Sequence, residues 1–162
     1  MPTHAIFYRL KQDHDLHRDL LAQLAQTHGA TDERADLFEQ FTLEVKGHAA
    51  AEEQALYSTM MRKPPTTEDT RHSVSEHHEI EELLNDLAAT DMASGAWLTK
   101  FKGLQERYLH HIDEEEEEHF PEFSKHLTKE DEAHMEAVFE RRKKAEKADA
   151  QVTPEKMEDA KD

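Results

Sequence analysis

Apolar residues recur at alternating three- and four-residue steps along most of the chain, and glycine, proline and threonine interrupt this pattern at intervals. Such spacing is typical of amphipathic helices. Breaks at Gly29, Pro64-Pro65 and Ser94-Gly95 separate four helices, and Thr128 with Asp131 resembles a capping box for a fifth. The helices are therefore expected at about residues 3–27, 32–62, 67–90, 96–126 and 129–147.

Four long helices joined by short connections predict an all-α fold, an antiparallel up-down four-helix bundle. The fifth helix carries Met135, Val138 and Phe139 on one side, so it either covers the bundle or meets a partner. Pro121 lies inside the fourth helix and predicts a kink there. The expected division is a bundle at 1–127, an additional helix at 128–148 and a flexible charged tail at 149–162.

Each of the four bundle helices has an inward stripe that is apolar at its ends and polar in its middle. The four stripes are Phe7, Leu10, His14, His17, Leu21, Leu24; Phe38, Phe41, Val45, His48, Glu52, Ala55; Ser73, His77, Ile80, Leu84, Leu87; and Phe101, Leu104, Tyr108, His111, Glu115.

The chain after Arg141, rich in Lys, Glu and Ala, has no such stripe and is expected to fray.

The two halves of the bundle resemble each other. His14 and His48 lie 34 residues apart (48 − 14), and so do His77 and His111 (111 − 77). A shift of 63 residues (77 − 14) also places Glu52 on Glu115. The chain is therefore predicted to form two similar helical hairpins that face each other.

The stretch His110–Phe120, "HHIDEEEEEHF", contains five consecutive glutamates, which would ordinarily form a solvated surface. His111 and Glu115 share a face with apolar Tyr108, whereas His110 and Glu114 lie on the polar side of the helix. We therefore expect Glu115 to point inward and most of the run to face water. The histidines outside the stripes are expected at the surface: His4, His28, His72, His78, His110, His119, His126 and His134.

Four histidines and two glutamates thus meet in the core at similar heights. Buried charges must be paired or bound to a metal, because burying them alone is costly. Residues four apart lie on one helix face, so His48 with Glu52, and His111 with Glu115, can each direct two ligands to one point. The chain has no cysteine, and imidazole with carboxylate suits iron, manganese or zinc.

The segments that carry these residues are "AIFYRLKQDHDLHRDLL", "HAAAEEQALY", "EHHEIEELLNDL" and "HHIDEEEEEHFPEF". As a set they resemble the hemerythrin family, specifically the HHE cation-binding domains, over about residues 5–126. The resemblance implies a four-helix bundle with two non-haem iron ions in an Fe–O–Fe type centre that can bind dioxygen. It implies these ligands, with the two glutamates as bridges: His14, His48, Glu52, His77, His111 and Glu115.

One position departs from the family's oxygen carriers, which have a further histidine four residues after the one in the third helix. Glu81 stands there, as a metal ligand or turned outward into water with Glu82. His17 either hydrogen-bonds a ligand or packs in the core, and Tyr108 either offers its hydroxyl to a bound small molecule or is a core aromatic. Since the ligand set is complete by Glu115, the chain beyond Arg141 is not expected to be needed for the site.

A formal net charge of −17 argues against nucleic acid and anionic membranes as partners. We find no secretory signal and no membrane-spanning apolar stretch, so a cytoplasmic location is the default expectation. The expected function is binding of dioxygen or a related diatomic ligand for sensing, storage or delivery. The alternatives are a di-iron oxidoreductase acting on peroxide, dioxygen or nitric oxide, an iron store or sensor, and a helical interaction module with a vestigial site.

Overall fold

The computed structural model describes the backbone of residues 4–150 and the side chains of residues 4–148. Helices make up all the regular structure of this part of the chain, which contains no strand. In order they are α1 Ala5–Ala25, α2 Asp32–Glu52, the π-helix η1 Glu53–Tyr57, α3 Ser58–Met61, the 3-10 helix η2 Pro64–Thr66, α4 Thr67–Ala88, α5 Gly95–Glu114, the π-helix η3 Glu115–His119, α6 Phe120–Ser124 and α7 Lys129–Ala150.

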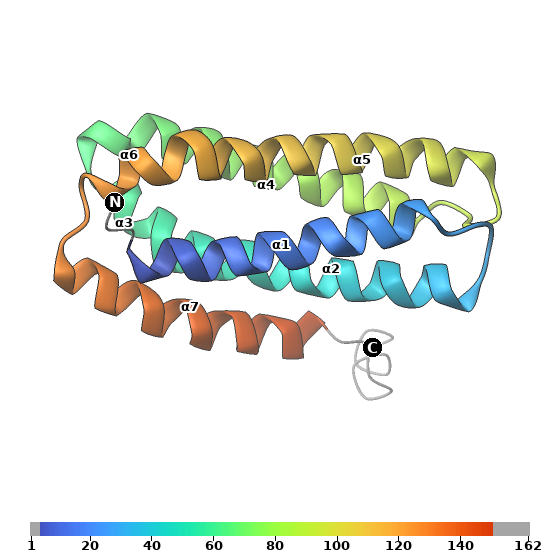
Figure 1. Ribbon diagram of the computed structural model, residues 1–162, viewed down its shortest axis with the longest axis horizontal. Coiled ribbons are helices and arrows are strands. Elements are labelled where there is room, and N and C mark those ends of the chain that lie inside the picture. Colours follow the sequence, from blue (N-terminus) through green and yellow to red (C-terminus); the bar gives the residue numbers. More distant parts are fainter. Residues whose placement is uncertain (1–3, 151–162) are drawn as a thin grey trace, which may run out of the picture.

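The four long helices α1, α2, α4 and α5 run up and down in an antiparallel bundle, which confirms the predicted fold class (Figure 1). The predicted breaks occur where the structure turns. Thr31 accepts a hydrogen bond from the Arg34 amide at 3.2 Å at the start of α2. Thr128 and Asp131 exchange hydrogen bonds of 3.0 and 3.1 Å before α7, so the capping box is confirmed.

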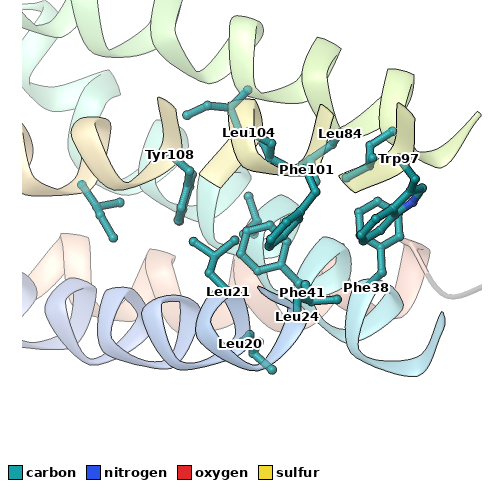
Figure 2. Close-up of a cluster of buried hydrophobic side chains, with 14 residues drawn as sticks. Leu20, Leu21, Leu24, Phe38, Phe41, Leu84, Trp97, Phe101, Leu104 and Tyr108 are labelled. Carbon is teal, nitrogen blue, oxygen red and sulfur yellow. The ribbon is translucent and has the colours of Figure 1, made fainter. Parts of the chain in front are cut away.

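Two apolar clusters occupy opposite ends of the bundle and leave its middle to polar residues. The first lies near the α1–α2 connection and includes Leu24, Phe41 and Trp97 (Figure 2). The second, at the other end, includes Phe7, Leu56, Phe123 and Phe139. This arrangement agrees with the predicted stripes, which are polar only in the middle, and the two clusters hold the helices together on either side of the polar layer.

The fourth predicted helix contains a π-helical turn just before Pro121. The turn covers Glu115–His119, and an equivalent one covers Glu53–Tyr57 in the first hairpin. The segment Glu53–Tyr57 has no proline in or beside it, so a π turn forms in this bundle without one. A π turn holds about 4.4 residues rather than about 3.6, so it changes which side chains face inward after Glu52 and Glu115.

Helix α7 lies along the α1–α2 side of the bundle (Figure 1). Its Met135, Val138 and Phe139 are buried in the second apolar cluster, so this helix covers the bundle rather than leaving that face free. A Cβ atom on Gly47 would lie 2.7 Å from Lys147 Cγ, so a larger residue here would require the Lys147 side chain to move.

The expected fraying after Arg141 is wrong up to Ala150, because the helix continues and the Lys143 side chain is buried against α1 and α2. Nearly all of the tail predicted at 149–162 lies outside the described residues. Within the described part, no helix combines the length and the apolar character needed to cross a membrane.

Candidate metal centre

The six residues predicted as ligands meet in the middle of the bundle. They come from the four long helices and from the start of the π turn η3. Their donor atoms form two groups, one of Glu52, His77, His111 and Glu115 and the other of His14, His48 and Glu52, with the atoms of each group within 4.8 Å of one another. All six side chains are buried. Because Glu52 belongs to both groups, the two form one continuous site, which we call the inner cluster.

Each glutamate of the inner cluster lies between imidazoles of both hairpins. Glu52 Oε1 is 3.1 Å from His77 Nε2, while Glu52 Oε2 is 3.7 Å from His48 Nε2. Glu115 Oε1 lies 3.0 Å from His111 Nε2 and 3.6 Å from His14 Nε2. Both carboxylates therefore lie between histidines of the two hairpins, and Glu52 belongs to both donor groups.

Most of the inward-facing atoms of the inner cluster have no hydrogen-bond partner. These atoms are the Nε2 atoms of His14, His48 and His111, both carboxylate oxygens of Glu52, and Oε1 of Glu115. Buried polar groups are almost always paired in folded proteins, because an unpaired one costs roughly 1–3 kcal/mol. A set of unpaired imidazole nitrogens and carboxylate oxygens that face one another fits bound metal cations.

The opposite nitrogen of each imidazole contacts a second carboxylate at hydrogen-bonding distance. A hydrogen bond at Nδ1 fixes the tautomer that leaves Nε2 free for a metal, and such partners normally accompany metal-binding histidines. We call these four residues the outer carboxylates. The pairs are His14 with Glu116 at 2.8 Å, His48 with Asp13 at 2.8 Å, His77 with Glu53 at 3.1 Å and His111 with Glu76 at 3.0 Å.

The outer carboxylates were not identified from the sequence, although the repeat contains them. Asp13 and Glu76 are 63 residues apart (76 − 13), and Glu53 and Glu116 are also 63 apart (116 − 53). Each stands directly beside an inner-cluster residue, so extending the shift of 63 to the neighbours would have found them. Glu116 also departs from the expected solvated run, since its side chain is only 16% exposed.

The carboxylates around the imidazoles make the inner cluster strongly attractive to positive charge. Burial lowers the pKa of His48, but the hydrogen bond to Asp13 and the nearby negative charge of Glu52 outweigh it and raise the pKa to about 9. Burial likewise lowers the pKa of His111, whereas Glu115 and Glu76 raise it to about 10. A metal cation would meet the same carboxylates, and it must displace the proton from each imidazole nitrogen that it binds.

One buried tyrosine, Tyr57, contacts the inner cluster directly, and a second, Tyr108, lies beside it with its ring centroid 6.4 Å from that of His111. Tyr57 donates a hydrogen bond to Glu115 Oε2 at 2.7 Å, a contact that its repeat counterpart Phe120 cannot make with Glu52. Tyr108 is hydrogen-bonded at 2.6 Å to His17, the residue for which either a ligand contact or core packing was expected. Burial raises the pKa of both tyrosines well above 10, so both keep their hydroxyl protons.

Glu81 lies outside the inner cluster. Its side chain is exposed, and it lines a pocket of about 280 Å³ between α2 and α4. The inner wall of that pocket includes His48, His77 and His111, while Arg142 of α7 lies at its edge. The role of Glu81 as a ligand therefore stays a prediction, as does the ligand role of the six inner residues.

Comparison with known proteins agrees with this geometry. The model of the Hemerythrin HHE cation binding domain family matches residues 5–123. No curated protein matches the chain. A similar fold occurs in the crystal structure of a hemerythrin HHE cation binding domain-containing protein from Mycobacterium kansasii, at 21% identity and a TM-score of 0.74, over 89% of this chain and 90% of that one. The chain thus belongs to the hemerythrin HHE cation-binding domain family.

Proposed function

We propose that the inner cluster holds two non-haem iron ions and binds dioxygen or a related diatomic ligand, for sensing, storage or delivery. The observation that carries the proposal is the set of unpaired, inward-facing donor atoms shared between two groups by Glu52. When bound, iron supplies open coordination positions and a reversible change of oxidation state. Imidazole and carboxylate without thiolate is a donor set that iron accepts.

In this proposal the four histidines anchor the metals, two on each, and Glu52 and Glu115 bridge them. The outer carboxylates hold each Nδ1 proton, so every imidazole presents its Nε2 lone pair to the centre. Tyr57 donates to the Glu115 oxygen other than the one nearest the imidazoles, which fixes the orientation of that bridge. These contacts keep the site in its binding geometry before any small ligand arrives.

Small ligands reach the centre, in this proposal, between α2 and α4. By the repeat, the boundary between α2 and α4 is equivalent to the boundary between α5 and α1; we call each boundary a seam. The pocket that contacts His48, His77 and His111 lies at the α2–α4 seam. Ala49 in the first seam corresponds to the larger Ile112 in the second, after the shift of 63 residues. Arg18, the counterpart of Glu81, further closes the second seam by hydrogen bonds to Asp113 at 2.9 Å and Glu116 at 2.7 Å.

A second candidate function is a di-iron oxidoreductase that reduces peroxide, dioxygen or nitric oxide. The observation in its favour is the hydrogen-bonded pair of Tyr108 and His17, because Tyr108 also lines the pocket. A protonated hydroxyl at that place can donate to a ligand in the pocket and be reprotonated through the imidazole. Binding alone does not require such a pair.

One spectroscopic experiment separates these functions. The iron-loaded protein is reduced without oxygen, its visible spectrum is recorded, and dioxygen is then added and removed. A spectrum that changes on addition and returns on removal supports ligand binding. Consumption of peroxide, dioxygen or nitric oxide over many turnovers with an electron donor would assign the oxidoreductase function instead, and release of iron would contradict both.

A variant pair tests the proposed entry path. Ala49→Leu should narrow the α2–α4 seam and slow azide or nitric oxide binding several-fold, while leaving the iron content unchanged. Ala35→Leu, on the same helix but away from the pocket, is the matched control. Equal rates in the wild type and Ala49→Leu would show that ligands enter elsewhere.

A further inference from the structure

A second group of histidines and carboxylates lies outside the inner cluster, on α4 and at the junction of α5 with η3. Its donor atoms form two sets that share Glu114, with the atoms in each set within 4.8 Å of one another. The first set adds His72 and Glu76 to Glu114, and the second adds Glu118 and His119. We call these five residues the side cluster.

Two imidazoles in the side cluster approach one carboxylate oxygen. Glu114 Oε1 lies 3.0 Å from His72 Nε2 and 3.2 Å from His119 Nε2. The His119 ring is buried, whereas the His72 side chain is 52% exposed. The side cluster therefore has a fixed inner part and an outer part that a cation can reach directly from water.

The π turn explains why His119 belongs to this group, although the sequence indicated a surface position for it. On an α-helix of about 3.6 residues per turn, the fifth residue after Glu114 would lie on a different face. A π turn instead joins residues five apart, and His119 follows Glu114 by that interval. The π turn that begins at Glu115 thus brings His119 over Glu114.

A buried hydroxyl holds the His119 ring in place. Ser73 Oγ lies 2.9 Å from His119 Nδ1, so the contact at Nδ1 leaves Nε2 facing Glu114. This is the arrangement seen in the inner cluster, where each Nδ1 is held and each Nε2 faces a carboxylate. Orientation by a second contact of this kind is characteristic of histidines that bind metals.

We propose that His72, Glu114 and His119 form a further metal site, for a divalent first-row cation such as Zn²⁺ or Fe²⁺. The two imidazoles belong to different sets in the structure, so the half-exposed His72 side chain turns toward His119 when the ion binds. Two imidazoles and one carboxylate leave one position of a tetrahedral ion for water or for Glu76 or Glu118, and this donor set is one that such cations accept. The site does not rest on the function proposed for the inner cluster, because the two sets of ligands are different. Glu76 connects the two clusters, because its Oε1 lies 3.3 Å from His72 Nε2 and 3.0 Å from His111 Nδ1.

The test is zinc binding to the iron-loaded, full-length protein. Zinc and iron per chain are measured by mass spectrometry after dialysis against Zn²⁺, and the zinc is located in crystals by anomalous diffraction at its absorption edge. The wild type should hold zinc at Glu114 with its iron retained. His72→Ala and His119→Ala should each lose one zinc per chain, while His28→Ala, which removes an exposed histidine elsewhere, should keep it.

The test remains valid even if His119→Ala does not fold, because His72→Ala tests the same site. His119 is buried, so its replacement can disturb the bundle, but His72 is half exposed and its replacement should leave circular dichroism and iron content unchanged. If His72→Ala folds normally and binds as much zinc as the wild type, the site is not there. Zinc that only replaces iron in the inner cluster, or that lies at other surface histidines, would equally overturn the proposal and leave His72 and His119 as hydrogen-bond partners of Glu114.

Discussion

An imidazole in the core presents a fixed nitrogen to a metal when its other nitrogen is held by the protein. In the inner cluster, an outer carboxylate holds each Nδ1 at 2.8–3.1 Å. Residues of one hairpin serve the other, since Glu116 supports His14 and Glu53 supports His77. The donor set therefore depends on both hairpins being docked, even though each hairpin carries its own histidines and glutamate.

Replacing one inner histidine should be far more damaging than replacing its exposed neighbour. His111→Ala leaves Glu115 and Glu76 without their imidazole partner in the core, so bound iron should fall by half or more and stability by about 3 kcal/mol. His110→Ala should change neither, because that side chain is 61% exposed. Iron analysis and thermal unfolding measure both effects, and equal damage from the two substitutions would refute the assignment of the inward face.

Glu81→Ala distinguishes a ligand from a pocket residue. Because Glu81 is exposed and lines the pocket, its removal should leave the iron content and the visible spectrum of the ligand-free protein unchanged. The affinity for azide, an anion that a pocket carboxylate repels, should rise a few-fold. A changed spectrum in the absence of azide, or iron lost from the protein, would show instead that Glu81 coordinates a metal.

At the scale of the helices, hydrophobic periodicity and the glycine and proline breaks were sufficient to predict the bundle, because both depend only on local sequence. The 63-residue repeat likewise identified His14 and His77 as equivalent positions, and Glu52 and Glu115 as another equivalent pair. The π turns were not predicted, since Glu53–Tyr57 has no residue type that marks one. The burial of His119 follows from such a turn and from Ser73 on another helix, and neither is visible in the periodicity of α5.

The contact between helix α7 and the inner cluster was not predicted from the sequence, because charged residues make it rather than an apolar stripe. Lys143 forms buried ion pairs with Asp13 at 2.8 Å and with Glu44 at 3.3 Å. Asp13 in turn holds His48 Nδ1 at 2.8 Å, and Phe139 packs edge-on against the His48 ring. The end of α7 is thereby connected to an inner-cluster histidine through Asp13. The expectation that the chain beyond Arg141 is not needed for the site stays a prediction.

Lys143→Met should accordingly weaken iron binding at the His48 side of the inner cluster. The methionine keeps the apolar stem but removes one of the two cations that contact Asp13, leaving only Arg9. Loss of such outer support typically costs about 10-fold in metal affinity. Lys144→Met, at the adjacent exposed position, is the control and should bind iron as the wild type does. Competition with a chelator measures the difference, and identical chelator curves would mean that α7 only covers the bundle.

At the scale of the whole molecule, the apolar clusters at the two ends stabilise the bundle while the polar middle opposes it in the absence of metal. Facing carboxylates and imidazoles without a cation leave several buried atoms unpaired. A cation that binds only the folded state therefore adds its binding energy to the stability of the fold.

Removal of iron by a chelator should lower the midpoint of thermal unfolding by about 10 °C, which corresponds to ~4 kcal/mol for a chain of this size. Hydrogen exchange should rise most in the middle of α1, α2, α4 and α5, where the inner cluster joins them. An iron-free protein with an unchanged midpoint would show that the polar layer is satisfied without metal.

The central claim is that two iron ions lie close together, bridged by Glu52 and Glu115. Iron analysis combined with EPR of the oxidised protein tests it most directly, because two bridged ferric ions couple and lose the signal of isolated ferric ions. We predict two iron ions per chain and no EPR signal from isolated high-spin ferric iron. One iron per chain, or an isolated-ion signal that accounts for all the bound iron, would contradict the bridged centre.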